Sequence, residues 1–416
     1  MVHRTLHTTL FVILFVGVYC SSVYPAGFLI YNQDAAAAGM GDTFTAMGDN
    51  PSAVFYNPAG ISQLEGTQIR SGFHLVFPDT SFRGSKSGER TDMSDDMSAL
   101  LTGYLTHKIN DKISVGAGIF TPFGLVTDWP SRWEGDTVST YSELRTFYVN
   151  PVISVKVHPR LSLAAGINYV YSDFKIRRVI DPNKVIGLPL GISPGKITLK
   201  GFDDSWGYNL GLIVHLSERW KLGVAYRSEV TLEFDGHAHY RLPPVLDALY
   251  PPTDISPRIK LPPLASANIS ARLWDKWTFA TGFFWTGWSV YDELSPKFRD
   301  SLLVPPSMKS APQDWRDVFA FQCGVQYQFN HVWVFRGGYI FDQSPVPERT
   351  LGPMVPDSDK HLISLGVGFT KDKLTIDIAS MVLLFEDRHT RRNIDGLNGK
   401  YTTTTGTFLV SFTYAF

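Results

Sequence analysis

Hydrophobic and polar residues alternate with a period of two along most of this chain. In the run 319–330, odd positions carry Phe, Cys, Val and Tyr, whereas even positions carry Ala, Gln, Gly and Asn. The same alternation recurs in the runs 161–169, 210–216, 277–285 and 363–369. Because successive side chains of a strand point to opposite faces, this period predicts β-strands with one face suited to hydrocarbon and the other to a polar lumen.

Short polar turns alternate with long loops rich in Pro, Gly and Asp. The short turns are Asn110-Asp111, His158-Pro159-Arg160, Ser217-Glu218-Arg219, Asp275-Lys276, Asn330-His331 and Lys371-Asp372. The long loops cover 79–97, 121–141, 181–196, 241–259, 291–314, 343–358 and 386–402. Six turns join twelve strands, and one further strand precedes them (67–78) and one follows (403–416). The pattern therefore predicts an all-β fold, a 14-stranded antiparallel transmembrane β-barrel over 67–416, which is closed because an open edge would leave backbone groups unpaired in lipid.

The C-terminal segment 403–416 supports this prediction. Its last alternating positions place Phe408, Val410, Phe412, Tyr414 and Phe416 on one face of a strand. An edge strand of a soluble β-sandwich would leave these aromatic side chains exposed and prone to aggregation. We therefore favour the closing strand of a barrel over the sandwich.

The N-terminal segment 1–26 has the layout of a secretory signal peptide. Arg4 supplies positive charge, and a short apolar stretch, 10–18, is followed by small and polar residues, with a cut expected between 20 and 26. No later stretch has the roughly 18 apolar residues of a spanning helix. After cleavage Cys323 is the only cysteine, so no intramolecular disulfide is expected.

Residues 27–66 are small, glycine-rich and poorly alternating. Their composition is compatible with either a periplasmic tail or a compact plug packed inside the barrel. Composition and charge then limit the function. Charged residues make up 19% of the chain, below the ~25% of soluble domains, and aromatic residues make up 13%. The 38 Lys and Arg against 39 Asp and Glu exclude a nucleic-acid protein that works through a broad basic surface.

Several motifs resemble the FadL family of outer-membrane transporters for long-chain fatty acids and other hydrophobic compounds. The matching features are Ala26-Gly27-Phe28, the triplet Asn57-Pro58-Ala59 followed by Gly60, the stretches 226–236 and 341–361, and the closing Tyr-Ala-Phe. The resemblance spans nearly the whole mature chain. It implies a barrel plugged by residues 27–66, in agreement with the independent strand count.

The resemblance also implies a route for the ligand. In the family, ligand lands in an external groove, passes to an internal pocket and leaves sideways where the third strand kinks inward. Counted along this chain, the third strand is about 113–122, where Gly116, Gly118 and Pro122 are expected to weaken strand pairing. The resemblance thus implies that Asn57, Pro58 and Ala59 are hatch residues and that Gly116, Gly118 and Pro122 are gate residues. Asp342, which matches a family aspartate, is expected to contact the hatch or gate.

Ligand-binding residues are expected in two outer loops and at two cations. The loops carry unusual apolar content, including Val185, Ile186, Leu188, Leu190, Leu246 and Leu249. These side chains either pack on each other as a lid or leave a groove for ligand. A buried carboxylate needs charge-assisted hydrogen bonds, and Arg178 matches the family's carboxylate-binding arginine in position, whereas Arg177 faces the opposite way. The second cation is either Lys309 or Arg316, and Phe28 is an implied ligand contact.

The sequence therefore predicts a monomeric outer-membrane protein of a Gram-negative bacterium that takes up long-chain fatty acids or similar apolar molecules. Its other expected partners are outer-membrane lipid and lipopolysaccharide, with no nucleic acid, cofactor, metal or catalytic residue. An aromatic or alkane hydrocarbon channel of the same family is the first alternative. An outer-membrane lipase is another, but no Ser and His pair stands at matching strand heights. A structural or adhesive barrel is the third.

Overall fold

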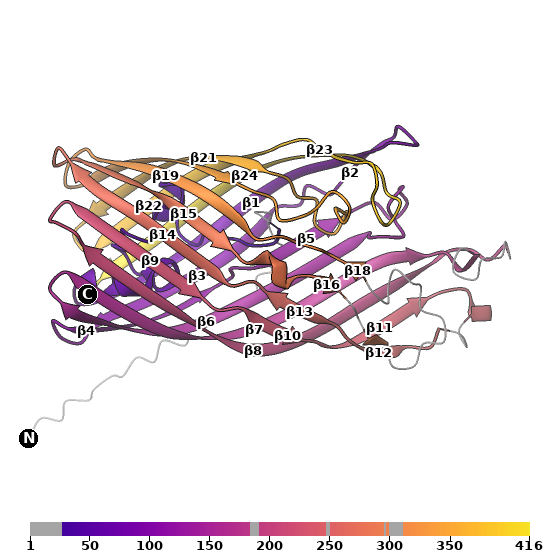
Figure 1. Cartoon of the computed structure of the whole chain (residues 1–416), viewed down its shortest axis with the longest axis horizontal. Helices are drawn as coiled ribbons and strands as arrows, with labels where there is room; N and C mark the ends of the chain where they lie inside the picture. Colours follow the sequence, from indigo (N-terminus) through magenta and orange to yellow (C-terminus); the bar gives the residue numbers. More distant parts are fainter. Residues whose placement is uncertain (1–26, 184–190, 247–249, 295–296, 299–310) are drawn as a thin grey trace, which may run out of the picture.

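The computed structural model describes residues 27–183, 191–246, 250–294, 297–298 and 311–416, and its strands close into a 14-stranded antiparallel barrel (Figure 1). Some strands are interrupted, so their segments carry separate labels. Eleven strands are uninterrupted, and in order around the wall they are β1 (Thr67–Gly84), β3 (Ser98–Lys108), β6 (Tyr141–His158), β7 (Leu161–Ile180), β8 (Gly195–His215), β15 (Trp277–Thr286), β19 (Val318–Gln328), β20 (Trp333–Asp342), β21 (Lys360–Lys371), β22 (Leu374–Phe385) and β24 (Gly399–Ala415). The third strand, between β3 and β6, consists of β4 (Ile113–Phe120) and β5 (Gly124–Asp128). Between β8 and β15, the seventh strand consists of β9 (Trp220–Arg227), β10 (Val230–Glu233) and β11 (Asp235–Arg241), and the eighth consists of β12 (Thr253–Ser256), β13 (Arg258–Leu261) and β14 (Leu264–Leu273). The short elements β2 (Arg90–Asp92), η2 (Pro244–Leu246), η3 (Trp288–Val290), β16 (Glu293–Leu294), β17 (Lys297–Phe298), β18 (Ala311–Pro312) and β23 (Arg388–Thr390) accompany the long loops.

The barrel is sealed by pairing between its first and last strands. β1 and β24 run antiparallel in continuous register from Gln68 opposite Ala415 to Gly84 opposite Gly399. With this pairing, β1 and β24 each have a partner strand on both sides. All six predicted short turns are confirmed, and they gather at one end of the barrel, which we call the short-turn end (Figure 1). β1 is longer than the predicted 67–78 because its pairing with β24 continues to Gly84.

The two faces of the wall carry different chemistry, as the alternation predicts. In β19, Phe319 and Phe321 are exposed on the outside, whereas Ala320 and Gln322 are buried. Of the C-terminal side chains predicted to share one face, the four aromatic ones, Phe408, Phe412, Tyr414 and Phe416, are exposed, whereas Val410 is buried. In these two strands, large apolar side chains therefore face outwards, and most inward side chains are small or polar.

Residues 27–66, which we call the hatch, lie inside the barrel towards the short-turn end (Figure 1). The hatch contains two short helices, α1 (Ala35–Gly39) and α2 (Ala53–Tyr56), and the 3₁₀ helix η1 (Pro58–Gln63). Of the two readings of this segment, the internal plug is the observed one. None of the helices in the described residues is long and apolar enough to cross a membrane.

Candidate functional site

A cavity of about 420 Å³ lies at the long-loop end of the barrel, above the hatch. This volume falls within the ~300–1,000 Å³ of typical ligand pockets. Its lining comprises Phe28, Leu125, Val138, Ser142, Glu143, Leu144, Phe174, Ile176, Arg178, Leu199, Pro257, Ile259, Tyr291, Leu294, Ala311, Pro312, Gln313, Trp315, Val346, Arg349, Thr350, Gly352, Met354, Val355, Ile394 and Asp395. Most of these side chains are apolar, so the cavity suits a greasy ligand with a small polar part.

Strand alternation positions the cation of this cavity. On β7, Phe174, Ile176 and Arg178 share the inward face and line the cavity. Arg177 points the other way and stacks on Tyr141, with its guanidinium carbon 4.2 Å from the ring centroid. The Nε of Arg178 is buried and has no hydrogen-bond partner among the described residues. Arg178 is therefore a positive group with free hydrogen-bonding capacity inside an apolar cavity.

Two loop residues add charge to the cavity. Burial raises the pKa of the Asp395 carboxyl, and the positive charge of Arg178 opposes that rise. Arg349 also lines the cavity but is largely exposed and pairs with Asp314, Nη1 to Oδ2 at 3.0 Å. Sequence reasoning missed both residues, since the loop positions 349 and 395 lie in no alternating pattern.

The base of the cavity is an aromatic cluster around the first residues of the hatch. The ring centroid of Phe28 lies 4.6 Å from that of Trp288, 5.5 Å from Tyr291 and 5.7 Å from Trp315. Phe123 of the barrel wall follows at 6.1 Å. Phe28, the ligand contact that the resemblance implies, thus lines the cavity and joins it to the hatch.

The start of the hatch is hydrogen-bonded to a break in the third strand, between β4 and β5. Leu29 and Phe123 form an isolated antiparallel bridge. The Ile30 amide donates to the Pro122 carbonyl at 2.7 Å, and the Gly124 amide donates to the Phe28 carbonyl at 2.9 Å. These main-chain bonds replace part of the strand pairing that the break removes. Movement of residues 28–30 would therefore disturb both the cavity base and the wall.

The break lies at the end of the predicted third strand, between Phe120 and Gly124, and includes Pro122, one of the three residues expected to weaken pairing. The expectation that Gly116 and Gly118 weaken pairing is wrong, because both pair with β3 and with β6. The absence of a side chain instead lets the hatch approach, since a Cβ on either glycine would lie 3.0 Å from a Val54 methyl. The ladder between β3 and β4 ends at Gly103 opposite Ile119, and β5 forms a ladder with β6 alone among the described strands.

The triplet Asn57-Pro58-Ala59 forms a bonded corner of the hatch. The Asn57 amide nitrogen donates to the carbonyls of Thr45 at 2.8 Å and Leu212 at 3.0 Å, and its oxygen accepts from the Ala59 amide. Pro58 begins η1, and both Pro58 and Ala59 are buried. One side chain therefore ties two parts of the hatch to strand β8.

Asp342 contacts the hatch directly. The Tyr31 hydroxyl donates to its Oδ2 at 2.8 Å, and Lys360 Nζ lies 3.6 Å from the same oxygen. The expected contact between Asp342 and the hatch is thus present in the structure, while a gating role is left to experiment.

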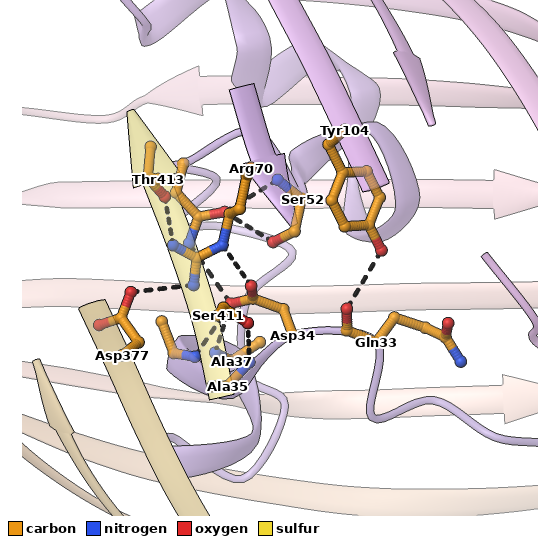
Figure 2. Close-up of polar contacts among 12 residues, drawn as sticks. Gln33, Asp34, Ala35, Ala37, Ser52, Arg70, Tyr104, Asp377, Ser411 and Thr413 are labelled. Carbon is orange, nitrogen blue, oxygen red and sulfur yellow. Dashed lines mark hydrogen bonds and ion pairs between the residues drawn. The ribbon is translucent and has the colours of Figure 1, made fainter. Parts of the chain in front are cut away.

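A buried ion cluster anchors α1 of the hatch to the wall (Figure 2). Arg70 of β1 donates from Nε to Asp34 Oδ2 at 2.5 Å and from Nη2 to Asp377 Oδ2 at 2.9 Å. Asp34 also caps α1 by accepting from the amides of Ala36 and Ala37. All three charged side chains are at most 3% exposed. We call Asp34, Arg70 and Asp377 the anchor; sequence reasoning did not identify it.

Other predicted ligand residues lie away from the cavity or outside the described residues. Arg316 is exposed and donates to the Ser344 carbonyl at 3.4 Å, so it does not line the cavity. Leu246 is buried but is likewise not part of the lining. The positions outside the described residues are Val185, Ile186, Leu188, Leu190, Leu249 and Lys309.

Comparisons with known proteins give a consistent result. A family model described as outer membrane protein transport protein (OMPP1/FadL/TodX) matches residues 16–416. A long-chain fatty acid transport protein of Salmonella typhi is 24% identical over 399 residues, covering 90% of each chain. The crystal structure of a Pseudomonas aeruginosa FadL homologue has a TM-score of 0.85 at 22% identity, covering 94% of this chain and all of that one. The Pseudomonas putida toluene transporter TodX has a TM-score of 0.74 at 17% identity, covering 92% and 98%.

Proposed function

The chain belongs to this family of outer-membrane transport proteins, and on that premise we propose that it takes up long-chain fatty acids across the outer membrane without an enzymatic step. The observation that carries the proposal is the cavity itself. Its walls are mostly apolar, and Arg178 is a half-buried cation whose buried Nε has no hydrogen-bond partner among the described residues. Apolar walls with one available cation match a molecule that has a long hydrocarbon tail and one carboxylate.

Energetics favour a path that never exposes the tail to water. Burying one methylene is worth about 0.8 kcal/mol, so a sixteen-carbon chain prefers apolar surroundings by roughly 12 kcal/mol. Ligand would enter from the outer loops, rest in the cavity and leave sideways between β3 and β5, where the break in the third strand leaves these two strands unpaired. Because residues 28–30 bond to that break and Phe28 lines the cavity, a shift of the hatch would open both together.

Binding measurements with two neighbouring arginines test the carboxylate role. We expect Arg178→Ala to weaken saturable palmitate binding to the purified protein by about 10- to 100-fold, since hydrogen bonds to a charged group are lost. Arg177→Ala is the matched control, because that side chain stacks on Tyr141 and does not line the cavity, and we expect a change below twofold. Hexadecanol binding should respond to neither substitution.

Two other outcomes would redirect the proposal. If Arg178→Ala weakens neither ligand but both bind saturably, the hydrocarbon-channel alternative is favoured, in keeping with the mostly apolar lining. If the unsubstituted protein binds no apolar ligand saturably, the transport proposal is abandoned.

A reversible crosslink tests the lateral exit. Leu29 and Phe123 face each other across an antiparallel bridge, a geometry that a disulfide can span. We expect Leu29→Cys with Phe123→Cys, in a Cys323→Ser background, to block palmitate uptake when oxidised and to restore it on reduction. Equal uptake in both redox states would refute coupling between the hatch and the exit.

A further inference from the structure

Arg227, at the end of β9, is a buried arginine without an acid partner. Its side chain is 5% exposed, and no carboxylate lies within 4 Å of it among the described residues. One Nη donates to Asn168 Oδ1, and the other donates to the Phe55 carbonyl at 3.3 Å. A buried charge without a counter-charge is costly, so such a group commonly serves a function.

Aromatic rings surround this guanidinium and lead back to the cavity. Its central carbon lies 5.1 Å from the centroid of Phe120, 5.4 Å from Phe55 and 5.8 Å from Tyr148. The Tyr148 ring lies 6.4 Å from Phe123, which in turn lies 6.1 Å from Phe28 at the cavity base. A row of rings thus connects the large cavity to Arg227, and Phe120 is the last residue of β4 before the break.

A second, small cavity beside Arg227 carries spare hydrogen-bond donors. It measures about 30 Å³ and is lined by Arg227, Asn209, Gln322 and Asp42, among others. The amide nitrogens of Asn209 and Gln322 are buried and lack an acceptor among the described residues. Since one water needs about 10–15 Å³ on this measure, the space holds two waters or the two oxygens of a carboxylate.

The acidic side chain at this cavity does not oppose an anion at neutral pH. Burial raises the pKa of the Asp42 carboxyl to about 8, and hydrogen bonds from Tyr56 and Asn32 only partly offset the effect. Asp42 is therefore mainly neutral at pH 7, and the cavity presents one cation and two unused amide donors.

From this geometry we infer that Arg227, Asn209 and Gln322 form a second carboxylate-binding site inside the barrel, which the row of rings connects to the large cavity and which lies beside Phe120 at the β4 side of the break. The inference rests on the proposed function. The head group of the fatty acid passes from Arg178 to Arg227 while its tail remains against the row of rings. Arg227 thus selects acids over neutral apolar molecules during passage.

The test compares an acid with its neutral analogue in the full-length protein. We expect Arg227→Gln to slow palmitate uptake by cells about tenfold, since a charge-assisted bond is lost, with hexadecanol uptake changed less than twofold. Saturable palmitate binding at the large cavity should also stay within twofold. Arg227→Lys should recover at least half of the palmitate rate.

A second variant guards against misfolding of Arg227→Gln. Gln322→Leu removes one unused donor without touching the bonds of Arg227, and we expect it to lower the palmitate-to-hexadecanol uptake ratio about threefold. Parallel loss of both substrates in either variant, or an unchanged ratio, would overturn the inference. Failure of the unsubstituted protein to bind palmitate would instead contradict the proposed function, so the two failures are distinguishable.

Discussion

Arg70 and Arg227 lie in the same lumen, are similarly buried, and have opposite surroundings. Arg70 donates to two carboxylates and to the Thr413 hydroxyl (Figure 2). Arg227 meets an amide oxygen, a carbonyl and three aromatic rings. An arginine whose donors are bonded to buried carboxylates and a hydroxyl has none left for a ligand, so its role is structural. A cation with no acid beside it can exchange partners, so the two arginines separate the fixed part of the plug from the path of the ligand.

The largest expected effect is at the anchor. Arg70→Gln would leave Asp34 buried without its ion pair and Asp377 with only Arg336, whose Nη1 lies 2.7 Å from Asp377 Oδ1. Breaking a buried pair in this way costs about 3–5 kcal/mol of unfolding free energy. The loss is measured as an earlier urea midpoint for the heat-modifiable gel mobility of the purified barrel. A loss below about 1 kcal/mol would mean that the anchor does not hold the hatch.

The next effect depends on pH and concerns Asp42 of the hatch, which lines the small cavity beside Arg227. Because its pKa is raised to about 8 from an unfolded value near 4, the folded chain holds an extra proton between those values. Unfolding free energy therefore falls as pH rises through this window, by at most about 1.4 kcal/mol per unit. Protease protection of the hatch should therefore decrease as pH rises from about 4 towards 8 and become independent of pH above about 8.

Asp42→Asn provides the control for that pH dependence, since its side chain cannot ionise. The variant should keep the same hatch protection as pH rises from about 4 to 8. An equally steep dependence in the variant would assign the effect to another group.

A smaller effect is expected for the stability of Arg227→Gln. The substitution removes an unpaired buried charge together with its two hydrogen bonds, so the costs and gains nearly cancel, to within about 1.5 kcal/mol. The same urea titration measures it. A loss as large as that of Arg70→Gln would make Arg227 a structural anchor and remove the contrast.

The smallest effect is expected at an exposed pair on the long-loop end. Arg90 Nε lies 2.7 Å from Asp92 Oδ1, and both side chains are more than half exposed. Arg90→Gln should change unfolding free energy by less than about 0.5 kcal/mol. A larger shift in the urea midpoint would show that the assay reports total charge instead of buried pairing.

The sequence predicted the wall far better than the interior. Alternation at 319–330 and the six polar turns identify strands, because strand faces repeat every two residues. The same rule separates Arg178 from Arg177. The anchor has no such signal, since Asp34 and Asp377 come from segments 36 and 307 residues away from Arg70. Only closure of the barrel brings them together.

The third strand shows why local composition was misleading for its glycines, although Pro122 does lie in the break. Glycine and proline in 113–122 predict weak pairing, yet both glycines pair normally with the neighbouring strands. Their missing side chains instead leave room for Val54 of the hatch. The Gln33 side chain takes over at the break, donating to the Thr121 carbonyl at 2.8 Å and accepting from its amide at 3.2 Å. Such replacement of a strand by a distant segment leaves no trace in the sequence of either one.

The seam between β1 and β24 has a consequence for assembly. Arg70 belongs to the first strand, Thr413 and Ser411 to the last, and Ser411 accepts from the amide of Ala35 in α1. The hatch is therefore bonded to both strands of the seam that closes the barrel. During biogenesis the last strand must therefore pair with the first before the hatch can be held in place. In an unfinished barrel the hatch is not yet fixed, and the step that closes the wall also fixes it.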